Sequence, residues 1–262
     1  ATRELRQANE KLMEVDRLKD DFMSTVTHEL RTPLTSIRAF SEMLHDDPDM
    51  SADDRTKFLG IIVGEAERLT RLINQILDFA KLESGRVEWE VERLDLRPLL
   101  SATAESIGQL FRDKGTVFVL ELPEDQQPVW VEIDRDRLKQ VVINLLSNAV
   151  KFVPPVAGLI RMTLTHDAGY AQVAVKDNGP GIPEAYQSII FERFRQGGNT
   201  MTDKPQGTGL GLPISREIVE HFGGKLWVES VPQDGAENSG EFAAGSTFIF
   251  TLPLARDGDV AL

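Results

Sequence analysis

The stretch FMSTVTHELRTPL, residues 22–34, lies in the middle of a long helical pattern and sets the class of the first part of the chain. Apolar residues recur on both sides of it at alternating steps of three and four, the spacing of a helical seam. The upstream seam, with Lys19 as its polar exception, runs through Leu5, Ala8, Leu12, Val15 and Phe22. The downstream seam runs through Val26, Leu30, Ile37, Phe40 and Leu44. We therefore expect one long helix here, bent near Pro33.

A second helix with the same spacing follows a break at Asp46–Asp49. Ser51 predicts its N-cap, because Asp54 follows three residues later in the manner of a capping box. The seam of this helix, interrupted by Glu65, comprises Phe58, Ile62, Leu69, Leu72, Ile76 and Phe79. One helical hairpin cannot bury so long a stripe by itself. The sequence therefore predicts an all-α hairpin that pairs with a second copy into a dimeric four-helix bundle.

The pattern changes after Ser84 and Gly85, where strands and helices begin to alternate. We expect helices at 94–114, 136–152 and 213–221. We expect strands at 117–122, 129–133, 159–166, 171–175, 225–231 and 246–254. Such a mixture predicts an α/β sandwich with helices on one face of the sheet. Residues 195–208 and 232–245 are rich in Gly, Pro, Asn and Gln and predict loops, the first of them long enough to form a lid.

Composition excludes several functional classes. The 262-residue chain has a formal net charge of -13, which argues against a general nucleic-acid binder. It has no cysteine, which excludes disulfides, thiolate zinc sites and a catalytic thiol. No apolar run is long enough to span a bilayer and no signal peptide is present, so we expect a cytoplasmic location for this part. The first residues read as mid-helix, which favours a longer parent chain, and the sequence leaves open whether that parent is membrane-anchored.

His28 brings chemistry to the first helix. It lies between seam positions Val26 and Leu30, which leaves its ring reachable. A neutral imidazole is a nucleophile that can attack a phosphoryl group. Glu29 could act as a base or orienting group, and Thr32 shares the face of His28 one turn later. Taken alone, these residues also fit a solvated surface histidine next to an incidental kink.

A polar stripe marks the helix expected at 136–152. Asn144, Asn148 and Lys151 follow one another at steps of four and three, with an apolar face behind them. Amide oxygens suit Mg²⁺, and a lysine suits a phosphate. A polar helix face without a ligand is the alternative interpretation.

A carboxylate at a strand end forms the next motif. Asp177 precedes Gly179 and Gly181, and its carboxylate could accept the 6-amino hydrogen of adenine while the glycines let the backbone approach the base. The same residues also fit an ordinary turn.

A glycine cluster from Gly207 to Gly211 precedes the last helix, where its amides could bind phosphate. Arg193 and Arg195 lie in the lid and could contact a triphosphate. A hinge and solvated loop charges are the respective alternatives.

The order of these motifs resembles the catalytic core of the two-component sensor histidine kinases. Residues 28–34 match the phosphoacceptor motif His-Glu-Leu-Arg-Thr-Pro-Leu throughout. The later motifs resemble the N, G1, F and G2 boxes of the Bergerat-type, or GHKL, ATP-binding fold that gyrase-type ATPases share. The resemblance covers nearly all of residues 20–254. It implies a homodimer that uses ATP and Mg²⁺ to phosphorylate His28 and then passes the phosphoryl group to an aspartate on a response regulator receiver domain.

The resemblance also implies roles for single residues. His28, Glu29 and Thr32 form the catalytic set. Asn148 is the principal Mg²⁺ ligand with Asn144 beside it, Lys151 binds phosphate, Phe152 lines the base pocket and Asp177 recognises adenine. The nucleotide-binding set is completed by Gly179, Gly181, Arg193, Arg195, Gly207, Thr208, Gly209, Leu210 and Gly211. Two positions depart from the usual pattern, Gln206 in place of a glycine and Pro213 in place of an alanine.

The domain boundaries expected from the resemblance are 1–21 for a coiled-coil signalling helix, 22–84 for dimerisation and phosphotransfer, 85–93 for a linker, 94–256 for ATP binding and 257–262 for a tail. Two rival functions remain. A gyrase-type ATPase switch would need no phosphoacceptor, and a non-catalytic dimeric scaffold predicts eroded nucleotide motifs. Phosphatase activity toward the regulator, through Thr32, is compatible with the kinase. No sensor domain is visible, and the sequence leaves open the regulator's identity and whether His28 is phosphorylated within or across subunits.

Overall fold

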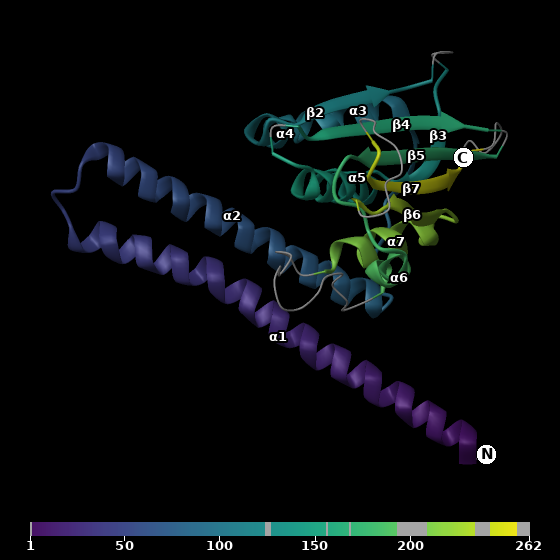
Figure 1. Ribbon diagram of the computed structural model, residues 1–262, viewed down its shortest axis with the longest axis horizontal. Helices are drawn as coiled ribbons and strands as arrows, with labels where there is room; N and C mark the ends of the chain where they lie inside the picture. The colour runs from purple at the N-terminus through teal and green to yellow at the C-terminus, as the bar shows by residue number, and fades with distance from the viewer. Residues whose placement is uncertain are drawn as a thin grey trace. The chain divides into compact units, whose positions relative to one another are not determined.

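The computed structural model describes residues 2–123, 127–155, 157–167, 169–192, 209–233 and 242–255. They fall into two compact units (Figure 1). One unit is helical and contains Ala1–Arg86, and the other is an α/β unit that contains Val87–Phe191 and Gly211–Leu262.

The helical unit is a hairpin of α1, Thr2–Asp46, and α2, Ala52–Glu83. Pro33 lies inside α1, where it is buried and does not end the helix. Ser51 caps α2, because its hydroxyl accepts a hydrogen bond from the Asp54 backbone N–H at 3.1 Å. The expected break and cap are therefore confirmed. The rings of Phe40 and Phe58 pack across the hairpin with centroids 5.1 Å apart.

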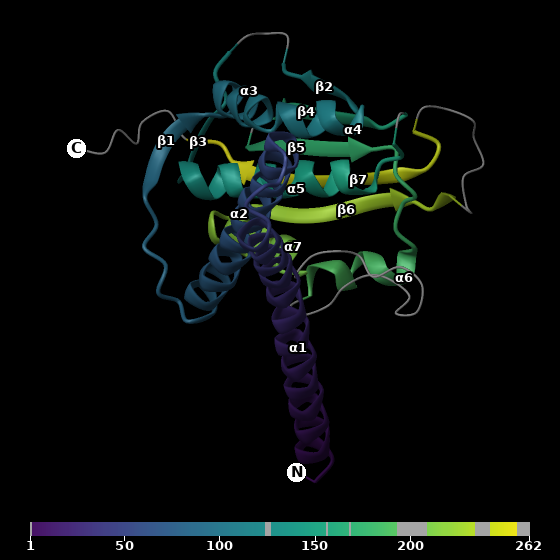
Figure 2. The same cartoon turned by 90° about the vertical axis from the view of Figure 1, so that its left-hand side faces the viewer.

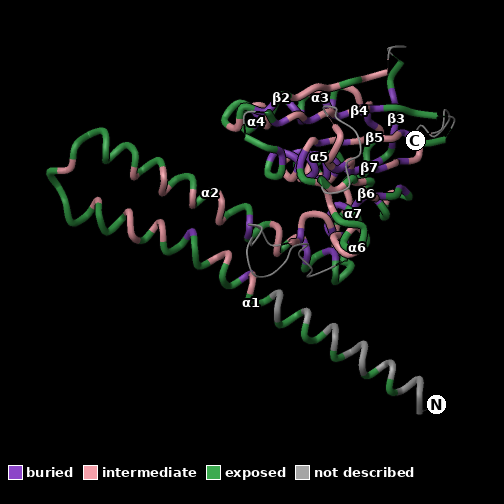
Figure 3. Tube along the Cα trace, viewed as in Figure 1, coloured by how far each residue is buried: buried purple, intermediate pink, exposed green. Residues whose placement is uncertain are grey.

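The hairpin buries only part of its apolar surface. Leu72 and Phe79 of the expected seam are buried, whereas Phe58, Ile62, Leu69 and Ile76 are half-buried. A further set of large apolar side chains is exposed, comprising Met23, Leu34, Met43, Leu59, Val63, Ile73 and Leu77. Figure 3 shows the contrast, since buried residues concentrate in the sheet and α5 while the described parts of α1 and α2 are mostly exposed or intermediate.

The α/β unit contains two sheets. The larger has the strand order β2-β4-β5-β7-β6, in which only the β2–β4 pair is parallel. Its strands are β2 Val117–Glu121, β4 Leu159–His166, β5 Tyr170–Asp177, β6 Lys225–Val231 and β7 Gly245–Pro253. The smaller sheet pairs β1, Val91–Asp95, with β3, Trp130–Asp134, in antiparallel register.

Helices cover one face of the larger sheet (Figure 2). They are α3 Leu96–Ser106, α4 Gly108–Lys114, α5 Arg135–Phe152 and α7 Gly211–His221, with the short α6 Glu184–Gln187 and the 3₁₀ turn Ile189–Phe191 between β5 and α7. Helix α5 packs on β4 and β5, and α7 packs on β6 and β7. Alternate residues of β4 and β5 point into this core, among them Ile160, Met162, Leu164, Val173 and Val175. The predicted α/β sandwich is confirmed.

Several details differ from the sequence prediction, apart from shifts of one or two residues at the ends of strands. The single helix expected at 94–114 is wrong, because the chain breaks at Ile107 and restarts at Gly108, a residue of low helix propensity. Strand β1 was not expected, and its first residues overlap the expected linker. Helix α7 begins at Gly211, two residues earlier than expected.

The chain that enters the α/β unit is held by that unit's own elements. Trp89 stacks on His221 near the end of α7, with ring centroids 4.0 Å apart, and meets Phe222 edge-on. Among the helices that the structure describes, none combines the length and apolar content that crossing a bilayer requires.

Candidate functional site

His28 is exposed on α1, as expected for a group that must reach a reaction partner. Thr32 lies one turn later, and its hydroxyl donates to the His28 backbone carbonyl at 3.1 Å. The Glu29 carboxylate turns toward α2 and accepts from Arg68 Nη2 at 3.2 Å. Arg68 was not anticipated from the sequence, because the pairing joins residues 39 positions apart. The structure thus holds Glu29 beside His28 by a partner on the other helix of the hairpin.

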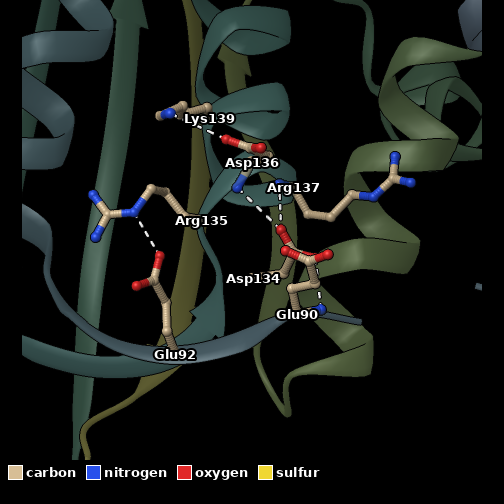
Figure 4. Close-up of polar contacts among 7 residues, drawn as sticks. All are labelled: Glu90, Glu92, Asp134, Arg135, Asp136, Arg137 and Lys139. Carbon is tan, nitrogen blue, oxygen red and sulfur yellow. Dashed lines mark hydrogen bonds and ion pairs between the residues drawn. The ribbon is translucent and has the colours of Figure 1, made fainter. Parts of the chain in front are cut away.

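Helix α5 carries the polar stripe, and its start is fixed by Asp134 (Figure 4). One oxygen of the buried Asp134 carboxylate accepts the backbone N–H groups of Asp136 and Arg137 at 3.0 and 3.1 Å. Its other oxygen accepts the Glu90 N–H at 3.1 Å. A carboxylate here is favourable because it satisfies orphan donors and lies at the positive end of the helix. It also explains why α5 begins at Arg135, one residue earlier than expected.

The apolar face of α5 is buried against the sheet and anchors the stripe. That face consists of Leu138, Val141, Val142, Leu145, Leu146, Ala149 and Val150. Asn144 and Asn148 are half-buried at its border, while Lys151 and Phe152 are exposed at the end of the helix. The Lys151 ammonium lies 5.0 Å from the centre of the Phe152 ring. The sequence-predicted residues of this helix therefore lie along one edge of it.

The end of α5 is supported by Lys114, a residue that sequence reasoning missed. Its ammonium donates to the backbone carbonyls of Val150 and Lys151, the latter at 2.8 Å. A cation at a helix C-terminus pairs with carbonyls that have no partner inside the helix. Burial lowers the pKa of Lys114 from its usual value. Lys114 therefore stabilises the turn that presents Lys151 and Phe152.

Asp177 ends β5 in a buried position, with 4% of its surface exposed. Its Oδ1 accepts the Gly179 N–H at 2.8 Å and the Ser246 N–H at 3.4 Å. Burial raises the pKa of Asp177 to about 6, and these two hydrogen bonds only partly oppose that shift. A carboxylate with few donors around it is one that a ligand amino group can satisfy.

The turn after Asp177 is packed too closely for side chains. Gly181 has a left-handed φ of 74°, and a Cβ atom on it would lie 2.2 Å from the Val231 carbonyl oxygen. A Cβ atom on Gly179 would lie 3.1 Å from the Phe152 carbonyl oxygen. Gly179 therefore lies against the end of α5 at Phe152.

Asn144 faces α7. Its Nδ2 donates to Ser215 Oγ at 2.9 Å, and a Cβ atom on Gly211 would lie 2.2 Å from its Oδ1. Gly209 has a left-handed φ of 68°, and Leu210 is fully buried. Arg193, Arg195, Gly207 and Thr208, which the sequence placed in the site, lie outside the described residues, as do the lid residues up to Gln206.

No metal centre is built from charged ligands in this part of the protein. Within the described ranges, no cluster of three or more His, Asp or Glu side chains could hold a metal ion.

Two family models match the two units. The model of the His Kinase A (phospho-acceptor) domain matches residues 18–85. The model described as histidine kinase-, DNA gyrase B- and HSP90-like ATPase matches residues 133–256. The chain belongs to the sensor histidine kinases.

The relatives of this histidine kinase core agree with that assignment. It is 36% identical over 260 residues to hybrid signal transduction histidine kinase D of Dictyostelium discoideum, covering 98% of this chain and 16% of that protein. It is 31% identical over 245 residues to the sensor histidine kinase WalK of Bacillus subtilis, covering 93% of this chain and 38% of that protein. The chain thus spans less than half the length of these two relatives.

Solved structures extend the likeness to the fold. The catalytic domain of the histidine kinase ThkA matches with a TM-score of 0.52 and 31% identity, covering 64% of this chain and 99% of that one. The histidine kinase ThkA in complex with the response regulator protein TrrA matches with a TM-score of 0.64 and 28% identity, covering 96% of this chain and 67% of that one. A helical hairpin followed by an α/β ATPase unit is therefore the architecture of a histidine kinase catalytic core.

Proposed function

We propose that this histidine kinase core transfers the γ-phosphoryl group of ATP to His28 and then donates it to an aspartate of a response regulator. The observation that supports the proposal best is the pairing of an exposed His28, within a complete phosphoacceptor motif, with the α5–Asp177 site on one chain. A gyrase-type conformational ATPase would have no use for the first of these. A non-catalytic scaffold would have no use for the second.

In the transfer step, one ring nitrogen of His28 attacks the γ-phosphorus, a nitrogen–phosphorus bond forms, and the bond to the ADP oxygen breaks. The attacking nitrogen must carry its lone pair, so the other ring nitrogen bears the proton. Glu29 follows His28 directly and could accept that proton or orient the ring. Its pairing with Arg68 fixes the direction of the carboxylate, so Arg68 acts on His28 only through Glu29.

The nucleotide would lie along the exposed edge of α5. The Asp177 carboxylate accepts a hydrogen bond from the adenine amino group, Phe152 lies against the base, and the Lys151 ammonium binds the phosphates. Guanine has a carbonyl in place of that amino group, so Asp177 would repel it, and ATP is the expected substrate. Asn148 would offer its carbonyl oxygen to Mg²⁺, which supplies charge neutralisation on the phosphates when bound. The residues present fit this ion, because the triphosphate itself completes the charge of the shell.

The partners proposed for the chain are a second copy of itself and a response regulator. The exposed large apolar residues of α1 and α2 support the homodimer, because they offer apolar surface that a second copy can cover. The solved ThkA structure contains a response regulator protein, and its likeness to this chain supports a regulator as the phosphoryl acceptor.

Labelling with γ-³²P-ATP and Mg²⁺ tests the proposal. We expect label on the wild type that is lost in acid and stable in alkali, as for a phosphohistidine. His28→Gln should remove the label and keep ATP binding. His45→Gln is the matched control, since His45 is an exposed histidine on the same helix and should leave labelling intact. Label that persists in His28→Gln, or equal binding of ATP and GTP by the wild type, would refute the respective assignment.

A further inference from the structure

The contact between α5 and α7 at Asn144 gives this residue a different role from Asn148. Asn144 Nδ2 donates to Ser215 Oγ at 2.9 Å, and Ser215 is 1% exposed. The hydrogen bond joins residues 71 positions apart, so it ties two helices together. Buried side-chain hydrogen bonds of this kind hold their elements in one arrangement, because breaking them leaves a buried donor without a partner.

The Asn144 amide also lies close to the first residue of α7, Gly211. A Cβ atom on Gly211 would lie 2.2 Å from Oδ1, 2.8 Å from Cγ and 2.9 Å from Nδ2 of Asn144. Distances under about 3 Å to all three atoms mean that no side chain fits at residue 211 while Asn144 stays in place. A side chain at residue 211 would therefore displace the Asn144 amide from its place against α7.

Together these contacts show that the orientation of the Asn144 amide is set by α7 from two sides. The amide nitrogen is held by Ser215 and the amide oxygen faces the backbone of Gly211. Asn148 lies one helical turn further toward Lys151, and its side chain is half-buried. The two asparagines of the stripe therefore have different surroundings, although the sequence presents them as a pair.

We infer that Asn144 is a positioning residue that fixes the start of α7 against α5 through Ser215 and Gly211, and that Asn148 alone of the two ligates Mg²⁺. The inference rests on the proposed function, because it assigns a task within the same nucleotide site. Gly211 opens α7, so fixing the start of α7 also fixes the backbone amide that would meet the phosphates. Binding of the triphosphate needs that amide and Asn148 at a set distance, and small displacements weaken such sites.

The experiment compares four variants of the full chain by calorimetric titration with ATP, once with Mg²⁺ and once with EDTA. The variants are Asn144→Ala, Ser215→Ala, the double variant and Asn148→Ala. We expect Asn144→Ala and Ser215→Ala each to weaken ATP binding about fivefold, the equivalent of one net hydrogen bond of roughly 1 kcal/mol. The loss should be the same with Mg²⁺ and with EDTA. The double variant should bind no more weakly than the weaker single variant, because both changes break one contact.

Asn148→Ala should behave differently, with a loss that is large in Mg²⁺ and small in EDTA. Ser147→Ala is the control, because it removes a hydroxyl from α5 whose hydrogen bond stays within that helix and should leave affinity unchanged. The inference is overturned if the loss in Asn144→Ala disappears in EDTA, if the single losses add, or if Ser215→Ala binds like the wild type. Failure of the wild type to bind ATP would instead refute the proposed function.

Discussion

Replacing Asp177 by Asn should separate the stability of the α/β unit from the adenine recognition proposed for it. The carboxylate is buried, and within the described ranges two backbone N–H groups, those of Gly179 and Ser246, donate to it. Burial raises its pKa to about 6, against an ordinary value near 4 for aspartate. The folded protein thus binds this proton more tightly than the unfolded chain does. Above the raised pKa, the folded protein must bury an ionised carboxylate, which costs stability. The Asn side chain is neutral at every pH, so Asp177→Asn does not have this cost.

The sign and size of the effect follow from proton linkage. A raised pKa makes the free energy of unfolding fall as pH rises from about 4 to about 6, because the folded state loses its more tightly bound proton. The full difference of about two pKa units corresponds to roughly 3 kcal/mol. Because the carboxyl is partly protonated at pH 5.2, the free energy of unfolding of the wild type should be about 1 kcal/mol higher there than at pH 8. The gap in the free energy of unfolding between Asp177→Asn and wild type should therefore be largest at pH 8 and become smaller as the pH falls.

Urea unfolding followed by tryptophan fluorescence measures this gap. The chain has 3 tryptophans, and Trp89, Trp130 and Trp227 all belong to the α/β unit, so the signal reports that unit alone. The range from pH 8 to 5.2 stays above the sequence pI near 4.8, where a low net charge promotes association. Only the change of this difference with pH is interpreted. Any effect of the amide on packing that does not depend on pH therefore cancels.

Asp167→Asn is the matched control. Asp167 lies in the turn between β4 and β5, and hydrogen bonds from the Gly169 and Tyr170 N–H groups lower its pKa. The ionised Asp167 carboxylate stabilises the folded protein, and this stabilisation is lost as pH falls. Asp167→Asn should therefore be less stable than wild type at pH 8, and the difference should become smaller as the pH falls. Parallel pH curves for wild type and Asp177→Asn would refute the reasoning, as would undiminished ATP binding by the variant.

Three further outcomes are expected. Leu72→Asp should dissociate or unfold the hairpin, at a cost of about 3 kcal/mol or more for an unpaired buried charge, whereas Leu72→Met should sediment like wild type; a stable wild-type monomer at micromolar concentration in sedimentation would contradict the homodimer. Thr32→Ala should keep labelling of His28 and lose dephosphorylation of a matched regulator, and a parallel fall of both rates would assign Thr32 only to the backbone bond that it makes with His28. Asp134→Ala should lower the tryptophan-detected stability by about 1–2 kcal/mol through the lost cap of α5, while Asp136→Ala, an exposed neighbour, should change it little; equal effects would remove the special role of Asp134.

The sequence predicted most of the fold, because the signals that it used are local. Repeating apolar residues at steps of three and four located both helices of the hairpin, and Ser51 located the start of the second. Strand β4 was predicted to the residue, since its alternation is regular. The missed strand β1 is short and half-exposed, and pairing with β3 rather than its own pattern defines it.

The candidate site divides in the same way. Asn148 and Lys151 could be found from spacing along one helix, and Asp177 from its place at a strand end. Arg68, Lys114 and Ser215 could not be found, because each acts on a residue more than 30 positions away. The sequence shows that these residues are polar. Which residue each of them contacts depends on how the elements pack in the folded chain, and the local sequence pattern does not reveal that.

The exposed apolar residues of the hairpin would make the two units respond differently to dilution in the proposed homodimer. Met23, Leu34, Val63 and Leu77 each keep more than half of their surface exposed within one chain. If a second copy covers them, folding of the hairpin is coupled to a bimolecular equilibrium, and each tenfold dilution removes about 1.4 kcal/mol of its stability per mole of dimer. The α/β unit has its own buried core, so its stability should not depend on protein concentration. The melting temperature of the hairpin is then a property of protein concentration as well as of sequence, and the phosphoacceptor helix is the part of the molecule whose order depends on how many copies a cell contains.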